Sequence, residues 1–241
     1  MQPLLYSELT SWYRLLDPPA DHLDEATAYE DALTRGLIGD GETLLELGVG
    51  AGHNALHLKR RFRCTLTDVS DQMLALSREI NPECEHLLGD MRSLRLHRLF
   101  DTVLVHDAVC YMTCEEELLA AATTAFLHTR PGGAALFAPD HLRDTFSEST
   151  ELIETDEGTR ALRCLAWTWD PNPADSVYTV DYAFLLRDGE TMKAVHDRHD
   201  EGLFPEVTWH RILASAGYAV ETISRPVDDD ATDQVFLCRK L

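Results

Sequence analysis

Short apolar segments alternate with helical patterns along residues 43–140, and this alternation constrains the fold more than any other feature of the chain. Parallel neighbouring strands require a crossover connection, which is usually a helix, so the alternation predicts a parallel sheet with helices packed against it. The expected strands are Thr43–Leu47, Cys64–Thr67, Glu85–Leu88, Asp101–His106 and Ala134–Ala138, and the expected helices are Gly52–Arg61, Ser70–Ile80 and Thr113–Leu127.

The pattern changes after residue 140. Strand-like segments at Arg160–Trp169, Ser176–Arg187 and Thr191–His199, with a turn signal at Asp188-Gly189, predict a small antiparallel β cap inserted after the fifth strand. A helix at Pro205–Ala216 and strands at Tyr218–Ser224 and Gln234–Arg239 then complete the main sheet, with Asp228-Asp229-Asp230 as a solvated turn. We therefore predict an α/β fold with a Rossmann-like, seven-stranded, mostly parallel sheet that has helices on both faces.

The predicted organisation has three parts. Residues 1–40 carry apolar residues at helical spacing from Leu4 to Leu16 and again over Ala26–Leu37, and they form an N-terminal helical lid. Residues 41–140 and 201–241 form the main domain. Residues 141–200 form the cap, which we expect on the side of the acceptor substrate.

Charge and cysteine usage narrow the function classes. The 241 residues include 21 Lys and Arg against 42 Asp and Glu, a net charge of −21, which disfavours nucleic acids and anionic membranes as partners. The chain starts without a signal-peptide pattern, and it has no apolar stretch approaching the roughly 20 residues of a membrane helix. Its six cysteines are scattered without zinc spacing. We predict a cytoplasmic protein without a metal that acts on a small molecule, and the cap strands would allow a homodimer.

A glycine-rich loop follows the first strand. Gly48, Gly50 and Gly52 leave room for a tight turn and for close approach of a ligand to the backbone, although such a loop can also be purely structural. Asp68 ends the second strand, where an acid can accept both ribose hydroxyls, and Asp90 ends the third strand, close to the expected adenine. Each acid alone would more often be a capping or turn residue, but the three strand ends together predict a nucleoside-containing cofactor.

A nicotinamide dinucleotide is the rival cofactor. Its fingerprint places a third glycine at position 53, where this chain has His53. Glu46 also puts an acid just before the turn, which would oppose a pyrophosphate but would favour the sulfonium and ammonium of S-adenosylmethionine. The charge argument favours the sulfonium cofactor.

Four segments together resemble class I S-adenosylmethionine-dependent methyltransferases. They are Leu44–Gly52 for the first motif, Asp68–Leu74 for the ribose acid, Gly89–Arg92 for the adenine and Pro131–Gly133 for the turn before the fifth strand. The resemblance implies S-adenosyl-L-methionine as cofactor and S-adenosyl-L-homocysteine as product. It implies a cofactor site made of Glu46, Gly48, Gly50, Gly52, Asp68, Val69, Met73, Asp90, Met91 and His106.

A narrower resemblance is to bacterial aminosugar N-methyltransferases, which act on nucleotide-linked deoxysugars. It covers Gly89–Arg92, Tyr111, Asp197-Arg198-His199 and Leu203-Phe204. The chain departs from that group at His106 and Asp107, where apolar or small residues are usual, and at Arg14, where an acid is usual. These departures bear on whether the acceptor is a sugar more than on whether the chain transfers a methyl group.

Candidates for the acceptor side come from the end of the fourth strand, the lid and the cap. His106 could act as a general base, or only its backbone could contact the cofactor. Among the N-terminal aromatic residues, Tyr13 is the preferred candidate for a role in the site. Tyr111 would either line the pocket or belong to the core. Asp197 and His199 share one face of a cap strand, and the alternative is an exposed strand of mixed charge. The predicted catalytic residues are His106, Tyr13 and His199, and the predicted substrate-binding residues are Tyr13, Asp107, Tyr111, Asp197 and His199.

The predicted reaction is in-line methyl transfer to a small molecule, with an amine such as a nucleotide-linked aminosugar as acceptor. Such a transfer depends mainly on alignment and exclusion of water, so a dedicated base is not required. O- or C-methylation of another metabolite is the alternative. Two hypotheses from other functional classes are an NAD-dependent oxidoreductase and a non-catalytic cofactor-binding protein.

Overall fold

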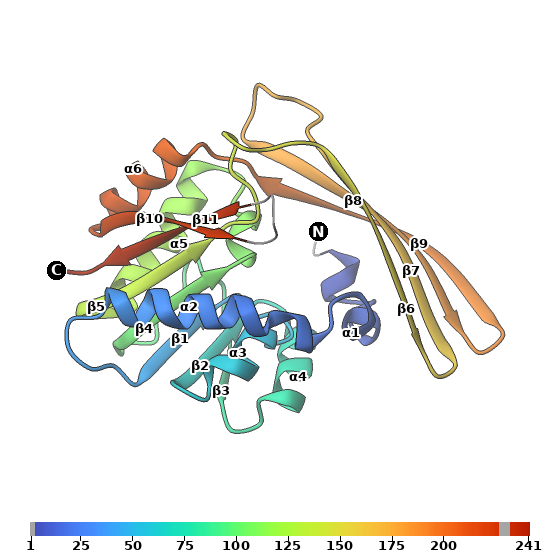
Figure 1. Ribbon diagram of the computed structural model, residues 1–241, viewed down its shortest axis with the longest axis horizontal. Coiled ribbons are helices and arrows are strands. Elements are labelled where there is room, and N and C mark those ends of the chain that lie inside the picture. The colour runs from blue at the N-terminus through green and yellow to red at the C-terminus, as the bar shows by residue number, and fades with distance from the viewer. Residues whose placement is uncertain (1–2, 227–231) are drawn as a thin grey trace.

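The computed structural model describes residues 3–226 and 232–241, which form two β-sheets and the helices around them (Figure 1). The seven-stranded sheet has the order β10-β11-β5-β4-β1-β2-β3, with β11 antiparallel to β5 and to β10. The predicted α/β fold with a mostly parallel sheet is confirmed. Its strands are β1 Thr43–Leu47, β2 Arg63–Asp68, β3 Glu85–Leu88, β4 Phe100–His106, β5 Thr129–Ala138, β10 Ala219–Pro226 and β11 Thr232–Arg239.

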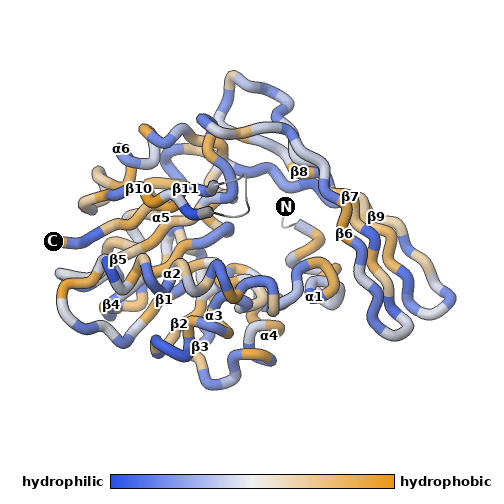
Figure 2. Tube along the Cα trace, viewed as in Figure 1, coloured by the Kyte–Doolittle hydropathy of each residue, from blue (hydrophilic) through white to orange (hydrophobic). Residues whose placement is uncertain are grey.

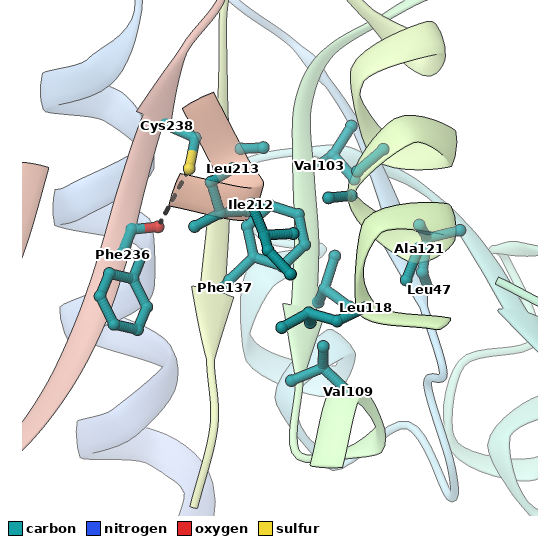
Figure 3. Packing of buried hydrophobic residues seen from close by; sticks show 14 of the residues in the cluster. Leu47, Val103, Val109, Leu118, Ala121, Phe137, Ile212, Leu213, Phe236 and Cys238 are labelled. Atoms are coloured by element: carbon teal, nitrogen blue, oxygen red, sulfur yellow. Dashed lines mark hydrogen bonds between the residues drawn. The ribbon is translucent and has the colours of Figure 1, made fainter. Parts of the chain in front are cut away.

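Alternation along the central strands separates two hydrophobic layers. On β1, Leu45 and Leu47 face the layer under α5 (Glu115–His128) and α6 (Glu206–Ala216), whereas Leu44 faces the layer under α2 (Leu23–Gly36) and α3 (His53–Leu58). A period of two places successive side chains on opposite faces of a sheet, and both faces here are covered by helices. Figure 3 shows the first layer, where Val103, Phe137 and Phe236 of the sheet lie near Leu118 and Ile212 of the helices.

The second sheet is a four-stranded antiparallel cap in the order β6-β7-β8-β9, which extends away from the main sheet (Figure 1). The predicted cap is confirmed, but it contains one strand more than the three expected. The missed strand lies at the edge and carries many exposed acidic side chains, so its sequence lacks the alternation of a half-buried strand. The cap strands are β6 Ser149–Glu157, β7 Arg160–Trp169, β8 Val177–Asp188 and β9 Thr191–Gly202.

Hydropathy distinguishes the two sheets. Figure 2 shows long hydrophobic stretches in the main sheet, whereas residues of the cap strands alternate between hydrophobic and hydrophilic. One face of the cap packs on the N-terminal segment, because Leu5, Leu9 and Leu15 join Leu162 and Phe184 in a buried cluster. The cap is therefore attached to the main domain partly through the first residues of the chain.

The N-terminal segment is less regular than predicted. In place of one helix from Leu4 to Leu16, the structure has two three-residue 3₁₀ helices, Leu4–Tyr6 (η1) and Thr10–Trp12 (η2), followed by the four-residue α1, Tyr13–Leu16. Another 3₁₀ helix, Pro19–His22 (η3), leads into α2. The apolar spacing correctly indicated that this segment buries one side. The short turns allow the segment to bend between the main sheet and the cap (Figure 1).

Other differences are small. Strand β5 begins at Thr129, so Pro131-Gly132-Gly133 lies inside an irregular strand and does not precede it. Helix α4 (Asp71–Ile80) begins as expected after Ser70, whose hydroxyl accepts a hydrogen bond from the Met73 amide at 3.1 Å. The acidic turn predicted at Asp228–Asp230 lies outside the described residues. Among the described residues, no helix is long and apolar enough to cross a membrane.

Candidate active site

A cavity of about 460 Å³ lies beyond the carboxyl ends of strands β1 to β4, where parallel sheets usually bind ligands. The main domain and the N-terminal segment both contribute to its wall. The predicted residues among those that line it are Tyr13, Glu46, Gly48, Gly50, Asp68, Val69, Met73, Asp90, Met91, His106, Asp107 and Tyr111. The fold thus brings together most of the residues selected from the sequence.

Gly48 keeps the floor of the cavity open. Its φ is +80°, and a Cβ at this position would lie 2.3 Å from the Cβ of Ala108 and 2.9 Å from Cε of Met91. Both contacts are too short for real atoms, so a side chain here would displace the wall of the cavity. The neighbouring loop glycine Gly50 has more space, and its amide donates to Asp68 at 2.8 Å.

The structure gives Gly52 a packing role, and its predicted contact with the cofactor remains a prediction. Gly52 is not among the residues that line the cavity, and it forms the N-cap of α3 with a φ of +80°. A Cβ there would lie 2.3 Å from Oγ of Ser77 and 2.5 Å from Nδ2 of Asn81, on α4 and just after it. Gly52 therefore permits close packing of α3 against α4, and the sequence pattern could not separate this role from cofactor contact.

Asp68 is held rigidly at the end of β2. Its two carboxylate oxygens accept hydrogen bonds from the amides of Gly50 and Ser70, each at 2.8 Å. Burial raises the pKa of Asp68, and the amide hydrogen bonds oppose that shift. The carboxylate also faces the cavity beside Val69 and Met73, which is the placement expected of a ribose-binding acid.

Asp90 lines the cavity next to Met91, but its carboxylate already has a strong partner. Arg92 donates to both carboxylate oxygens through Nε, at 3.0 and 3.1 Å, and holds the pKa of Asp90 below its usual value. An adenine amino group would have to share this acceptor. The predicted adenine contact of Asp90 and Met91 remains a prediction.

Glu46 is an unusual group for a phosphate site. It is 3% exposed, one of its carboxylate oxygens has no hydrogen-bond partner, and burial raises its pKa to about 8. A cationic ligand group would stabilise the ionised carboxylate, whereas a pyrophosphate would repel it. The cavity also contains the buried Nε2 of His53 without a partner. This donor set fits the ammonium and carboxylate of a methionine moiety.

A network of histidines and carboxylates joins the N-terminal segment to the end of β4. Asp17 contacts His22 at 2.7 Å and His53 at 3.1 Å, and Glu25 contacts His106 at 3.2 Å. Burial alone would lower the pKa of His22, but Asp17 and Glu25 outweigh this effect and raise it to about 9. The sequence analysis missed Asp17, His22, Glu25 and His53 because they approach one another only in the fold.

His106 belongs to this network, and its surroundings argue against the predicted role as a general base. Nε2 of His106 lies 2.6 Å from Asp107 and 3.2 Å from Glu25. Burial alone would lower the pKa of His106, but these two carboxylates hold it well above the usual range. An imidazole that is already protonated cannot accept the proton of an acceptor, so the side chain serves as a buried cation.

Comparison with known proteins identifies the chemistry of this cavity. Residues 44–133, which form its floor, match the family described as a methyltransferase domain. The chain is an S-adenosylmethionine-dependent methyltransferase. The cavity is compatible with that cofactor, because Gly48 leaves its floor open and the carboxylates of Asp68 and Glu46 line it. The ribose contact of Asp68 and the cofactor contact of Glu46 remain predictions.

Relatives of the methyltransferase act on sugars that carry an amine. The chain is 28% identical over 204 residues to the dTDP-3-amino-3,4,6-trideoxy-alpha-D-glucopyranose N,N-dimethyltransferase of Streptomyces venezuelae, an alignment that covers 83% of this chain and 85% of the relative. Its fold is similar to that of Streptomyces venezuelae DesVI, with a TM-score of 0.85, 22% identity and 98% of each chain covered. It is also similar to CalS10, an amino pentose methyltransferase from Micromonospora echinaspora solved with S-adenosylmethionine bound, with a TM-score of 0.81, 21% identity and coverage of 98% and 97%.

The methyltransferase has a second, smaller cavity next to the first. It measures about 240 Å³ and shares His22, His106 and Asp107 with the cofactor cavity. Four carboxylates and one guanidinium line it, from Glu25, Asp107, Asp140, Asp233 and Arg225. Arg225 is itself paired with Glu25 at 3.0 Å and with Asp233 at 2.9 Å, and His106 is paired with Asp107 at 2.6 Å, so cations balance most of the carboxylates that line this space.

Asp107 stands where the two cavities of the methyltransferase meet. Its φ of +44° with ψ of −59° lies outside the favoured regions for a residue with a side chain, and such strain concentrates at functional sites. The side chain is 56% exposed and is within reach of both spaces. The predicted substrate-binding role of Asp107 is therefore compatible with its placement.

Asp197 and His199 do not line either cavity of the methyltransferase. They share one face of β9, as predicted, but the alternative of an exposed strand is wrong, because they are 6% and 1% exposed. They lie behind Tyr111, whose hydroxyl is 2.8 Å from Nδ1 of His199. His196 points to the opposite face and contacts Asp181 at 2.7 Å.

The absence of a metal from the methyltransferase remains a prediction. In the described part of the chain, ligand atoms of Asp17, His22 and His53 lie within 4.8 Å of one another, as do those of Cys110, Asp140 and Glu201. Hydrogen bonds within the first group account for the Asp17 carboxylate, which accepts from both imidazoles.

Proposed function

We propose that the enzyme transfers the methyl group of S-adenosylmethionine to the amine of a sugar, with a nucleotide-linked aminosugar as the acceptor. The observation that carries this proposal is the carboxylate of Asp107, which is 56% exposed and lies where the two cavities meet. An ammonium group gains charge attraction from this carboxylate in addition to a hydrogen bond, whereas a hydroxyl gains only the hydrogen bond and a carbon gains neither. The substrate named for the Streptomyces venezuelae relative, a sugar with a 3-amino group, has the required chemistry.

The roles of the residues follow from their placement. Bound S-adenosylmethionine supplies an electrophilic methyl group. Glu46 and the Asp17 network surround the position of its methionine end, and Asp68 and Asp90 face its nucleoside. Tyr13 and Tyr111 line the same cavity on the acceptor side, where their rings exclude water and restrict the approach of the amine. Burial raises the pKa of both phenols well above the usual value, so they act as neutral hydrogen-bonding groups.

The test is an assay with labelled S-adenosylmethionine and three matched acceptors. They are the dTDP-linked 3-amino sugar, the same molecule with a hydroxyl in place of the amine, and the amino sugar without its nucleotide. We expect label on the amine of the first, identified by mass spectrometry, and none on the hydroxyl analogue. Methylation of the hydroxyl analogue alone would contradict the proposal. If the third acceptor reacts as fast as the first, the acceptor is still an amine, but the nucleotide is not part of what the enzyme recognises.

We further propose the three-part organisation given by the sequence, with a lid at 1–40, the cofactor-binding domain at 41–140 and 201–241, and the cap at 141–200 on the acceptor side. Support comes from the contact of lid residues Tyr6 and Tyr13 with the cofactor cavity. We also propose a cytoplasmic location, in keeping with six cysteines that are all free thiols. Fractionation of the native host that placed the protein outside the cytoplasm would contradict the second point.

A homodimer through the cap is the remaining proposal. The outer face of the cap carries exposed apolar side chains from all four strands, and charged residues beside them are already paired, as in Arg163 with Glu154 and Arg198 with Asp181. A locally neutral, apolar face suits a second copy of a chain whose net charge is −21. Sedimentation of the intact protein and of Trp167→Glu should show a dimer and a monomer, and a monomeric wild type would contradict the proposal. The apolar side chains are Leu152, Leu165, Trp167, Leu185 and Met192.

A further inference from the structure

A line of hydrogen-bonding side chains runs from the cofactor cavity into the cap. The hydroxyl of Tyr111 donates to the hydroxyl of Tyr6 at 2.9 Å, and it also lies 2.8 Å from Nδ1 of His199. Nε2 of His199 is 3.1 Å from Oδ2 of Asp197. Only the two tyrosines line the cavity, so His199 and Asp197 reach it through Tyr111.

The end of this line is firmly fixed. Asp197 also accepts a hydrogen bond from the amide of Leu5 at 2.8 Å, which ties the lid to β9. Burial would raise the pKa of Asp197, but the hydrogen bonds from His199 and the lid backbone hold it below its usual value. An ionised carboxylate accepts the Nε2 proton of His199 and thereby leaves Nδ1 free to accept from Tyr111 when the single hydroxyl hydrogen of Tyr111 turns from Tyr6 to His199.

We propose that Tyr111, His199 and Asp197 form a relay that removes the proton of the acceptor ammonium, an inference that rests on the proposed amine acceptor. The N–H bond of the ammonium breaks as its proton passes to the hydroxyl oxygen of Tyr111, and the hydroxyl's own proton passes to Nδ1 of His199. The amine keeps the electron pair of that bond and becomes nucleophilic. His199 becomes an imidazolium beside the Asp197 carboxylate, so charge is conserved and no further reactant is needed.

Tyr111 is the catalytic residue of this relay, because it lines the cavity, and His199 and Asp197 are positioning residues. The arrangement also explains a buried polar pair that the cofactor does not require. His106 cannot replace it, because its two carboxylate partners already keep that imidazole charged.

Other ionisable groups face His199, and one of them is a rival. Tyr6 of the lid and Tyr182 of β8 pack against the imidazole with ring centroids 5.5 and 4.8 Å away. Glu201 of β9 lies 3.9 Å from Nδ1 and is hydrogen-bonded by Tyr178, and burial raises the pKa of its carboxyl. Asp107 and Asp140 act on the same region electrostatically. Glu201 is the group that could take the proton of Tyr111 in place of His199.

The test compares pH profiles of methyl transfer to the amine for the wild type and for Tyr111→Phe, His199→Gln and Glu201→Gln. Without the relay, only acceptor that has already lost its proton reacts, so the kcat of Tyr111→Phe and His199→Gln should rise about tenfold per pH unit below the titration of the amine. We expect a loss on the order of 100-fold at pH 7 that shrinks to a few-fold at pH 9.5. A variant that fails to fold would not recover at high pH.

His196→Gln is the matched control. His196 stands on the same strand but on the opposite face, exposed to solvent, and the variant should keep the wild-type profile. Wild-type profiles in both Tyr111→Phe and His199→Gln would overturn the relay. If the pH profile shifts in Glu201→Gln but not in His199→Gln, then Glu201 and not His199 accepts the proton of Tyr111.

A second readout does not depend on turnover. In histidine labelled with ¹⁵N, the proposal requires the resting enzyme at pH 8 to show a neutral His199 with its proton on Nε2, assigned by the signal missing in His199→Gln. An imidazolium, or the tautomer with the proton on Nδ1, would overturn the relay. If the wild type fails to methylate any amine while the tautomer is as expected, the proposed function has failed and the hydrogen-bond arrangement has not.

Discussion

The cofactor side and the acceptor side of the active site are built in different ways. The cofactor side is made of strand ends and backbone, with Gly48, Asp68 and Asp90 at the ends of three neighbouring strands. The acceptor side is made of side chains from distant segments, and its hydrogen bonds join Tyr6 to Tyr111 and Leu5 to Asp197. The main sheet fixes these strand-end residues of the first side, whereas the second side exists only when lid, sheet and cap have assembled.

This difference predicts how each side responds to change. A backbone-built site fails when a main-chain position loses its conformation or its space, and the rest of the molecule offers no substitute. A site built from side chains of three segments loses single interactions and keeps its neighbours. We therefore expect the largest effects of single substitutions on cofactor binding, measured with S-adenosylhomocysteine by calorimetry.

The largest expected effect is that of Gly48→Ala. The added Cβ meets Ala108 and Met91, and the φ of +80° adds backbone strain, so together the cost should be about 3 kcal/mol or roughly 100-fold in Kd. Gly39→Ala is the matched control, because Gly39 has nearly the same φ, +79°, but nothing within 4 Å of its Cβ position. Equal cofactor affinity in Gly48→Ala and the wild type would break the claim that the backbone forms this side.

The same contrast explains how much could be predicted from the sequence. The cofactor side lies within residues 43–91, where period-two strands, the glycine loop and the strand-end acids are all local patterns, and most of these residues line the cavity. Gly52 was the exception, because a glycine needed for helix packing looks the same as one needed for a ligand. The fold class followed from the same local patterns.

The acceptor side resisted prediction because its contacts cross the whole chain. One part of the cofactor side shares this property, because the contact of His53 with Asp17 appears only when the lid folds over α3. Asp197 and His199 were placed on one face correctly, but nothing local indicates that Tyr111 would stand between them and the cavity. The acid-rich edge strand β6 was missed for the same reason, since its pairing with β7 is a tertiary fact.

A smaller effect is expected for Asp68→Ala. The substitution removes the acceptor of two backbone amides and of the ribose hydroxyls, which should weaken cofactor binding by about 1–3 kcal/mol, or roughly 5- to 150-fold. Asp71→Ala, at an exposed position three residues further along, should leave the Kd within about twofold. Wild-type affinity in Asp68→Ala would show that the backbone of the loop holds the nucleoside without this carboxylate.

The smallest effect concerns pH and Glu46. Because burial raises the pKa of this carboxyl to about 8, the folded protein without cofactor binds one proton more than the unfolded chain between about pH 4.5 and 8, and its stability falls as pH rises through that window. A cationic methionine end favours the ionised carboxylate, so cofactor binding should release a proton there. Between pH 7 and about pH 8 the Kd should then tighten by roughly fivefold.

Glu46→Gln separates this effect from other titrations. The amide cannot ionise, so the variant should lose the proton release, which calorimetry in buffers of different ionisation enthalpy measures directly, and its Kd should change little with pH. It should also unfold at a higher temperature than the wild type above pH 8, because no buried charge then needs to be desolvated. Persistence of the full proton release in Glu46→Gln would assign it to the histidine network around Asp17, and the cofactor side would then depend on the lid as much as the acceptor side does.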